Sequence, residues 1–159
     1  MSKSVKGTKT EKNLLKAFAG ESQARNRYTY FAGTARKEGL EQIANIFIET
    51  ADNEKEHAKV FLAYLEGGDV EIVAAYPAGE VKDTRSNLEA AADGEKMEWS
   101  TIYADFAAMA KGEGFPDIAR SFEQIARVER FHESRYRKLA ANVAGGEAFK
   151  KKSPVKWHC

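Results

Sequence analysis

Two short segments of the chain place a histidine three residues after a glutamate, at Glu54–His57 and Glu129–His132. Both lie in stretches whose apolar residues recur at helical spacing, so each pair should share one helix face, about 4.5 Å apart along the axis. A carboxylate and an imidazole placed in this way can bind one metal ion or two adjacent ions. Each pair taken alone is weak support for such a site, since Glu-x-x-His also arises by chance.

Single glutamates interrupt the other two apolar stripes near their middle, at Glu21 and Glu95. Glu21 precedes Glu54 by 33 residues and Glu95 precedes Glu129 by 34, so the two halves of the chain resemble copies of one motif. Burying an unpaired carboxylate costs several kcal/mol, whereas a whole domain is stable by only about 5–15 kcal/mol. Four buried carboxylates therefore predict cations among them, in the form of a dinuclear metal site.

Lysine and arginine offer few alternatives to metal as the balancing charge. Arg25 and Arg127 are the nearest candidates, and neither clearly points inward. Carboxylate oxygens combined with two imidazoles favour iron or manganese. Zinc also fits such ligands but has no redox chemistry, and calcium or magnesium would not need imidazole.

Glu98 adds a further carboxylate three residues after Glu95, where the symmetry of the two halves would place a histidine. It is either a solvated surface residue or a seventh ligand that makes one metal position different from the other.

Helical periodicity in four long segments predicts an all-α fold that would position these side chains. The segments run over about 10–37, 40–65, 86–112 and 116–144. Thr8 with Glu11, and Ser86 with Glu89, have the pattern of capping boxes that open the first and third helices.

The lengths of the connections predict how these helices are arranged. Short joints within the first and second pairs make antiparallel hairpins, whereas the 17 residues 69–85 are enough to cross the length of a hairpin. This pattern predicts a ferritin-like four-helix bundle, with a plain up-and-down bundle as the alternative. We expect one domain over residues 1–146 and a separate tail over 147–159.

Bulk composition narrows the function classes. A chain of 159 residues with 43% hydrophobic content can bury one sizeable core, and its net charge of +1 argues against nucleic acid as the main partner. No apolar run has the length of a membrane span, and the first residues lack a secretory signal, so we expect a cytoplasmic protein. The single cysteine, Cys159, excludes a disulfide within the chain.

Five motifs carry a resemblance to a known family, the rubrerythrins, over essentially the whole chain. They are FAGESQARNRY (18–28), ETADNEKEHA (49–58), EGGDVEIVAAYPAG (66–79), GEKMEW (94–99) and ERFHE (129–133). The resemblance implies a non-haem di-iron protein with a ferritin-like bundle. It also implies an NADH-linked peroxidase that reduces hydrogen peroxide to water in oxidative-stress defence.

Carried over residue by residue, the resemblance implies seven metal ligands. They are Glu21, Glu54, His57, Glu95, Glu98, Glu129 and His132. His57 and Glu98 would exchange as ligands of one iron when its oxidation state changes. Tyr28 and Tyr103 match tyrosines that donate hydrogen bonds around the cluster, although from sequence alone they also read as ordinary core aromatics.

The end of the chain, VKWHC, resembles the start of the rubredoxin-like domain of the family, whose Cys-x-x-Cys pair would begin at Cys159. We therefore expect either a trimmed chain or a protein that lacks this domain, with electrons supplied by a rubredoxin-type donor. Family members are commonly homodimers, and 69–85 is where a helix swap would hinge.

Two other functions remain open at this point. One is a ferroxidase or iron-handling protein of the ferritin type, which would assemble a hollow shell. The other is a non-enzymatic bundle that binds redox-silent metal.

Overall fold

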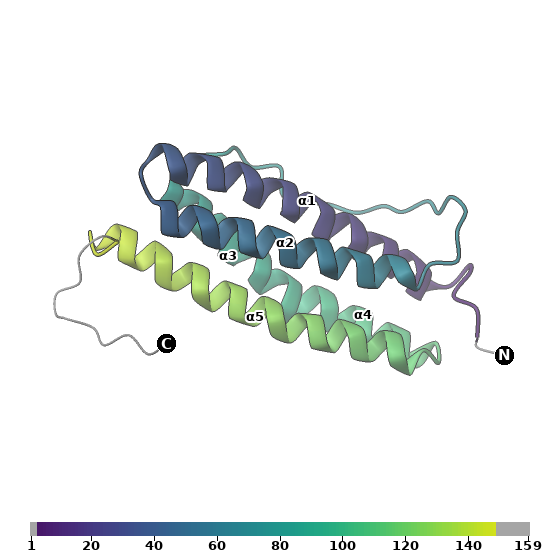
Figure 1. Ribbon diagram of the computed structural model, residues 1–159. Coiled ribbons are helices and arrows are strands. Elements are labelled where there is room, and N and C mark those ends of the chain that lie inside the picture. Colours follow the sequence, from purple (N-terminus) through teal and green to yellow (C-terminus); the bar gives the residue numbers. More distant parts are fainter. Residues whose placement is uncertain (1–2, 149–159) are drawn as a thin grey trace.

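The computed structural model describes residues 3–148, and all regular structure in this range is helical (Figure 1). The elements in chain order are α1 (Lys9–Lys37), α2 (Glu41–Ala63), α3 (Thr84–Met97), the π-helix η1 (Glu98–Ile102), α4 (Tyr103–Gly112) and α5 (Pro116–Ala144). The predicted all-α class is therefore confirmed.

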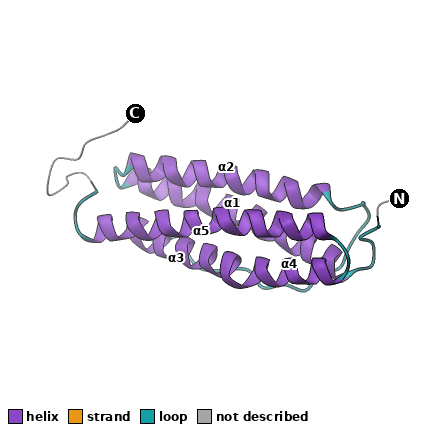
Figure 2. Cartoon of the chain, turned by 90° about the horizontal axis from the view of Figure 1, so that it is seen from below, coloured by secondary structure: helices purple, strands orange, loops and turns teal. Residues whose placement is uncertain are grey.

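Two antiparallel helical hairpins make up the bundle. The first consists of α1 and α2, and the second of α5 with the nearly continuous rod formed by α3, η1 and α4, as Figures 1 and 2 show. Residues 64–83 start at the end of α2, run beside α1, and cross to the opposite end of the bundle, where α3 begins (Figure 1). This crossover confirms the ferritin-like arrangement, and the plain up-and-down alternative is wrong.

Caps define where the first and third helices begin. Thr8 accepts a hydrogen bond from the Glu11 amide at 3.1 Å, and Glu11 accepts one from the Gly7 amide at 2.8 Å, so the predicted start of α1 is confirmed. The predicted capping box at Ser86 is wrong. Asp83 caps α3 instead by accepting from the Ser86 amide at 3.0 Å, so α3 begins two residues earlier than expected.

A π-helix interrupts the rod that we predicted as one continuous helix over 86–112. It covers five residues and begins at Glu98. A π-turn holds more residues than an α-turn, and such insertions within helices often occur at functional sites. The interruption thus coincides with the acidic residue whose role the sequence left open.

The hydrophobic core is divided into two clusters, and a glutamate separates them along each rod. Rings of Tyr28, Phe47 and Tyr136 belong to one cluster, and those of Phe61 and Phe122 belong to the other. The separating residues are Glu21 on α1, Glu54 on α2, Glu95 on α3 and Glu129 on α5. The four carboxylates therefore lie at one level along the bundle, between the two clusters.

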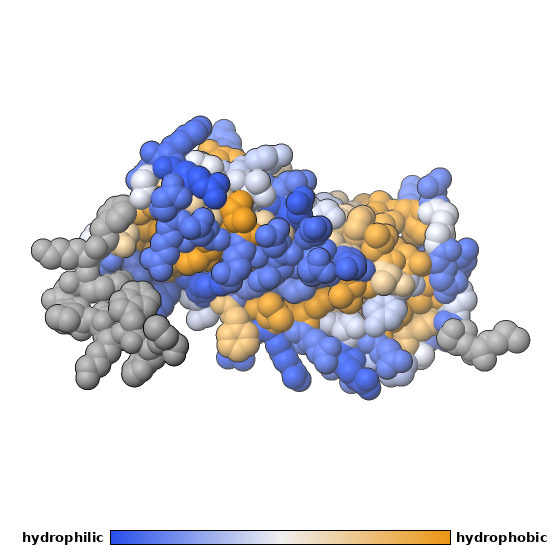
Figure 3. Space-filling model, viewed as in Figure 1, coloured by the Kyte–Doolittle hydropathy of each residue, from blue (hydrophilic) through white to orange (hydrophobic). Residues whose placement is uncertain are grey.

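Hydrophilic residues cover much of the face shown in Figure 3, with a band of hydrophobic side chains among them. Phe131 is the most exposed aromatic residue of α5, at 76%. Among residues 3–148, no helix is both long enough and apolar enough to cross a bilayer. The tail predicted over 147–159 lies, from residue 149 onward, outside the described residues.

Candidate metal centre

Four carboxylates, one from each rod of the bundle, meet in its interior. Glu21, Glu95 and Glu129 are fully buried, and Glu54 is 1% exposed. His57 from α2 and His132 from α5 lie among them, each one helical turn beyond a glutamate of its own helix. The helical spacing read from the sequence thus brings these six side chains together.

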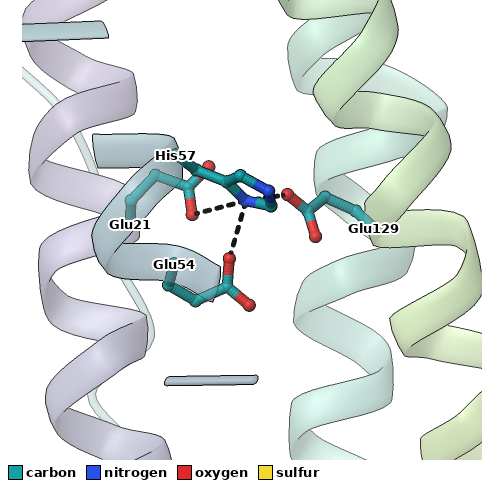
Figure 4. A group of neighbouring side chains, drawn as sticks. All are labelled: Glu21, Glu54, His57 and Glu129. Atoms are coloured by element: carbon teal, nitrogen blue, oxygen red, sulfur yellow. Dashed lines mark hydrogen bonds and ion pairs between the residues drawn. The ribbon is translucent and has the colours of Figure 1, made fainter. Parts of the chain in front are cut away.

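The first of two groups surrounds His57 (Figure 4). The Nδ1 atom of His57 lies 2.8 Å from Oε1 of Glu129 and 3.0 Å from Oε2 of Glu54. Oε2 of Glu21 is slightly farther from the same nitrogen, at 3.8 Å. Three helices therefore supply four potential ligand atoms to one small volume.

The second group surrounds His132 in the same way. Its Nδ1 atom lies 2.7 Å from Oε2 of Glu129, 3.3 Å from Oε1 of Glu54 and 3.6 Å from Oε2 of Glu95. Glu95 thus occupies the position in this group that Glu21 occupies in the first, as the carboxylate farthest from the histidine.

Glu54 and Glu129 belong to both groups, and each directs one oxygen toward each histidine. The two imidazole rings are nearly parallel, with centroids 6.2 Å apart and an interplanar angle of 26°. Glu21 and Glu95 each belong to one group only, and we call them the end carboxylates. Two shared carboxylates flanked by two end carboxylates are the arrangement expected around a pair of neighbouring cations.

Hydrogen bonding leaves much of this polar cluster unsatisfied. Buried atoms without a hydrogen-bond partner include both oxygens of Glu129, one oxygen each of Glu21, Glu54 and Glu95, and Nδ1 of His132. Several of these atoms lie close together, yet without the alignment that a hydrogen bond requires. Buried polar atoms normally have partners, so converging atoms that lack them fit a metal pair better than a hydrogen-bonded network.

Without a cation nearby, burial disfavours the ionised form of the carboxylates. It raises the pKa of Glu21 and Glu95 well above the ordinary carboxyl range, and nearby carboxylates raise both further. Burial also opposes the ionisation of Glu54, but the two adjacent histidines outweigh it and lower its pKa to about 2.

The two histidines, unlike Glu21 and Glu95, are favoured in their charged forms. Burial disfavours their charged forms, yet the surrounding carboxylates outweigh it, raising the pKa of His132 to about 12 and that of His57 strongly as well. A metal ion must therefore displace protons from this cluster when it binds.

Arginine and lysine do not balance the four carboxylates. Arg25 and Arg127, the two candidates noted in the sequence, are both exposed. Within residues 3–148, the ion pairs of the four glutamates involve only His57 and His132.

Tyr28 and Tyr103 flank the cluster and are both buried. The Tyr28 hydroxyl donates to Oε1 of Glu95 at 2.5 Å, and the Tyr103 hydroxyl donates to Oε1 of Glu21. Burial and the adjacent negative charge raise the pKa of both phenols, so each keeps its proton and remains a donor. The two tyrosines therefore orient the two end carboxylates.

Glu98 lies apart from both groups. It is half-buried at the start of η1 and lines a cavity together with Tyr28 and Tyr103. Partial burial raises its pKa, and the charges of Glu21 and Glu95 raise it further, which places it within the field of the cluster.

Asn53 is a site residue that the sequence analysis missed. Its Nδ2 atom lies 3.2 Å from Nε2 of His132, on the side of the ring away from the carboxylates. A metal on Nδ1 leaves the ring proton on Nε2, so the Asn53 amide holds the imidazole in place when it is turned to let Oδ1 accept from Nε2. Only its place next to Glu54 in the sequence could have suggested this role.

Comparison with known proteins agrees with this geometry. A family model described as Rubrerythrin matches residues 12–140. The chain is 57% identical to a rubrerythrin of Porphyromonas gingivalis over all of this chain and 80% of that protein. It is 55% identical to a rubrerythrin of Nitratidesulfovibrio vulgaris, covering 99% of this chain and 82% of that protein.

Solved structures of related proteins share the fold. Nigerythrin in its fully reduced, all-ferrous state superposes with a TM-score of 0.75 at 32% identity, over 89% of this chain and 73% of that chain. Symerythrin from Cyanophora paradoxa also gives 0.75, but at 23% identity, over 91% of this chain and 90% of that chain, and so supports the fold alone. Sequence, architecture and the shared carboxylates lead to one conclusion: the chain belongs to the rubrerythrin family.

Proposed function

We propose that this protein is a di-iron peroxidase, which reduces hydrogen peroxide to water in defence against oxidative stress. The observation that carries the proposal is the sharing of Glu54 and Glu129 between two adjacent ligand groups. A pair of ferrous ions held there would supply the two electrons that, with two protons, convert one hydrogen peroxide into two molecules of water.

Seven side chains are proposed to hold the metal pair, and iron is the proposed native metal because the reaction needs redox chemistry. Manganese or zinc are substitutes that the same ligand types accept, although zinc would be inactive. The proposed ligands are Glu21, Glu54, His57, Glu95, Glu98, Glu129 and His132.

His57 and Glu98 are proposed to alternate as ligands of the metal position next to Glu21. His57 lies within the first ligand group, and Glu98 lines the adjoining cavity together with Tyr28 and Tyr103. A neutral imidazole suits the lower metal charge and an anionic carboxylate suits the higher one, so the exchange would follow the oxidation state.

Tyr28 and Tyr103 are proposed to take part by holding the end carboxylates in place. Both hydroxyls keep their proton, and each donates a hydrogen bond to a proposed ligand. Positioned donors of this kind orient ligands without being consumed.

Electrons are proposed to arrive from a rubredoxin or a rubredoxin-like domain, linked to NADH through a reductase. We further propose that the protein works in the cytoplasm as a homodimer, with the crossover as the hinge of any helix exchange between subunits. Size-exclusion chromatography with light scattering tests the dimer, and a shell of about two dozen chains would contradict it.

Stopped-flow spectroscopy of the iron-loaded, reduced protein tests the reaction. We expect hydrogen peroxide to oxidise the iron pair much faster than dissolved oxygen does. Equal rates, or faster oxidation by oxygen, would favour the ferroxidase alternative. Zinc as the only retained metal, with no spectral change on adding peroxide, would favour a redox-silent bundle.

Metal content tests the ligand assignment independently of activity. We expect Glu54→Gln to bind little metal, because Glu54 belongs to both ligand groups. Glu56→Gln is the matched control, since Glu56 lies on the same helix with a side chain that is 61% exposed. Equal metal content in the two variants would contradict the assignment.

A further inference from the structure

A cavity of about 290 Å³ lies between the crossover, α1 and η1. Tyr76 of the crossover forms one wall and is anchored to α1, because its hydroxyl donates to the Lys16 carbonyl at 2.7 Å. Gly20 of α1 faces this ring, since a Cβ placed there would lie 3.6 Å from it. Figure 1 shows the crossover running alongside α1.

The walls of the cavity are mainly apolar. Residues of this kind come from all the surrounding elements and include Ala17, Ala24, Ala75, Pro77, Ile102 and Phe106. Hydrogen peroxide has only two heavy atoms, and one liquid water occupies only about 30 Å³. The cavity is therefore much larger and more apolar than hydrogen peroxide alone requires.

Polar groups of the cavity lead directly to the metal centre. Glu98, Tyr28 and Tyr103 all belong to the lining. The two tyrosines donate hydrogen bonds to Glu95 and Glu21, so only one contact separates the lining from the carboxylate cluster.

Gln23 supplies a further polar atom of the lining. Its buried Oε1 atom has no hydrogen-bond partner within the described chain. An O–H group of a bound molecule can satisfy such an acceptor, whereas a purely apolar ligand would leave it unpaired.

We infer that this cavity binds the organic part of a small alkyl or aryl hydroperoxide and presents its O–O bond to the metal centre. The inference rests on the proposed peroxidase function and extends it to a second substrate class. In the reaction, the O–O bond breaks and two electrons from the reduced iron pair enter with two protons. One oxygen leaves as water, the other stays on carbon as an alcohol, and the rubredoxin-type donor restores the two electrons.

Gly20→Leu tests the inference by filling the cavity, with Gly33→Leu as the matched control. Both glycines lie in α1, but a Cβ at Gly33 meets no atom within 4 Å and this residue does not line the cavity. We expect Gly20→Leu to slow oxidation of the reduced protein by cumene hydroperoxide at least about tenfold, while the rate with hydrogen peroxide changes less than about twofold. Gly33→Leu should leave both rates unchanged.

Binding of the product alcohol provides a readout that needs no turnover. Saturation-transfer NMR on the oxidised, iron-loaded protein should detect 2-phenyl-2-propanol bound to the wild type and to Gly33→Leu, but not to Gly20→Leu. Tyr76→Ala, which removes a wall of the cavity without changing the sequence of α1, should also weaken this binding.

The outcomes separate this inference from the function on which it rests. If hydrogen peroxide oxidises the protein but cumene hydroperoxide does not, or if the two glycine variants behave alike, the inference is overturned and the peroxidase function stands. If neither peroxide oxidises the reduced protein, the proposed function fails. The binding experiment then decides the cavity assignment by itself, and absence of alcohol binding to the wild type overturns it.

Discussion

Two buried tyrosines offer a stringent test of how the end carboxylates are held. Tyr28 and Tyr136 are 2% and 0% exposed, and their rings meet edge to face with centroids 5.5 Å apart. The Tyr28 hydroxyl donates to Glu95 at 2.5 Å, whereas the Tyr136 hydroxyl has no well-formed hydrogen bond. The adjacent Thr50 hydroxyl is already bonded to the Ile46 carbonyl and to Arg135.

Replacing each tyrosine by phenylalanine removes one oxygen from the same aromatic cluster, but with different consequences. Tyr28→Phe leaves a buried oxygen of Glu95 without its donor. With metal bound, Glu95 is ionised, and a hydrogen bond to a charged group contributes about 1.5–3 kcal/mol, so we expect a loss of that size in the free energy of unfolding of the metal-loaded protein. Tyr136→Phe removes an unsatisfied buried hydroxyl, so its stability should stay within about 0.5 kcal/mol of wild type or increase.

Urea unfolding followed by circular dichroism measures both effects under identical metal loading. With a slope of about 2 kcal/mol per molar urea, Tyr28→Phe should lower the midpoint by roughly 1 M, and Tyr136→Phe should leave it nearly unchanged. Equal losses for the two variants would refute the reasoning, because they would mean that ring packing, rather than the bond to Glu95, determines the cost.

Three further predictions concern other parts of the molecule. Glu113 accepts hydrogen bonds from the Thr10 amide and hydroxyl at 2.8 and 2.6 Å, and these contacts lower its pKa. Its contribution is therefore present above the ordinary carboxyl pKa and disappears as pH falls through the lowered value. Glu113→Gln should cost about 1 kcal/mol at neutral pH and progressively less toward about pH 3, as urea titrations across this range would detect. Asn53→Leu should weaken metal binding about 10–100-fold in chelator competition, because His132 loses the partner that orients it, whereas Asn45→Leu, at an exposed position of the same helix, should not. Removing the metal with a chelator should lower the calorimetric melting temperature, since the buried carboxylates lose their cations, and an unchanged melting temperature would contradict a structural contribution of the metal.

The sequence was sufficient to predict the bundle and the six clustered side chains, for an energetic reason. Four glutamates on apolar stripes cannot all be buried without cations, so their presence fixed both the inward face of each helix and the depth of the site. The crossover was predictable because a long connection between two tight hairpins has few other uses.

Features set by competition between similar local interactions were not predictable. Asp83 and Ser86 are both good helix caps, and only the structure shows that Asp83 takes this role while Ser86 becomes its donor. The contact of Asn53 with His132 joins two helices and leaves no periodic pattern in either. The apolar residues around the π-helix also fit the spacing of an ordinary α-helix, so hydrophobic periodicity did not reveal it.

The π-helix at 98–102 has a consequence for how sequence change would affect this protein. Each residue added to or removed from a helix turns everything beyond it by about 100° around the axis. The five residues of η1 therefore act as a register element between Glu95, which faces the carboxylate cluster, and Tyr103, which must reach Glu21. Within residues 3–148 only the second hairpin contains such an element, so a single-residue deletion over 99–102 would shift the register of Glu95 against Tyr103 while leaving every proposed ligand in the chain.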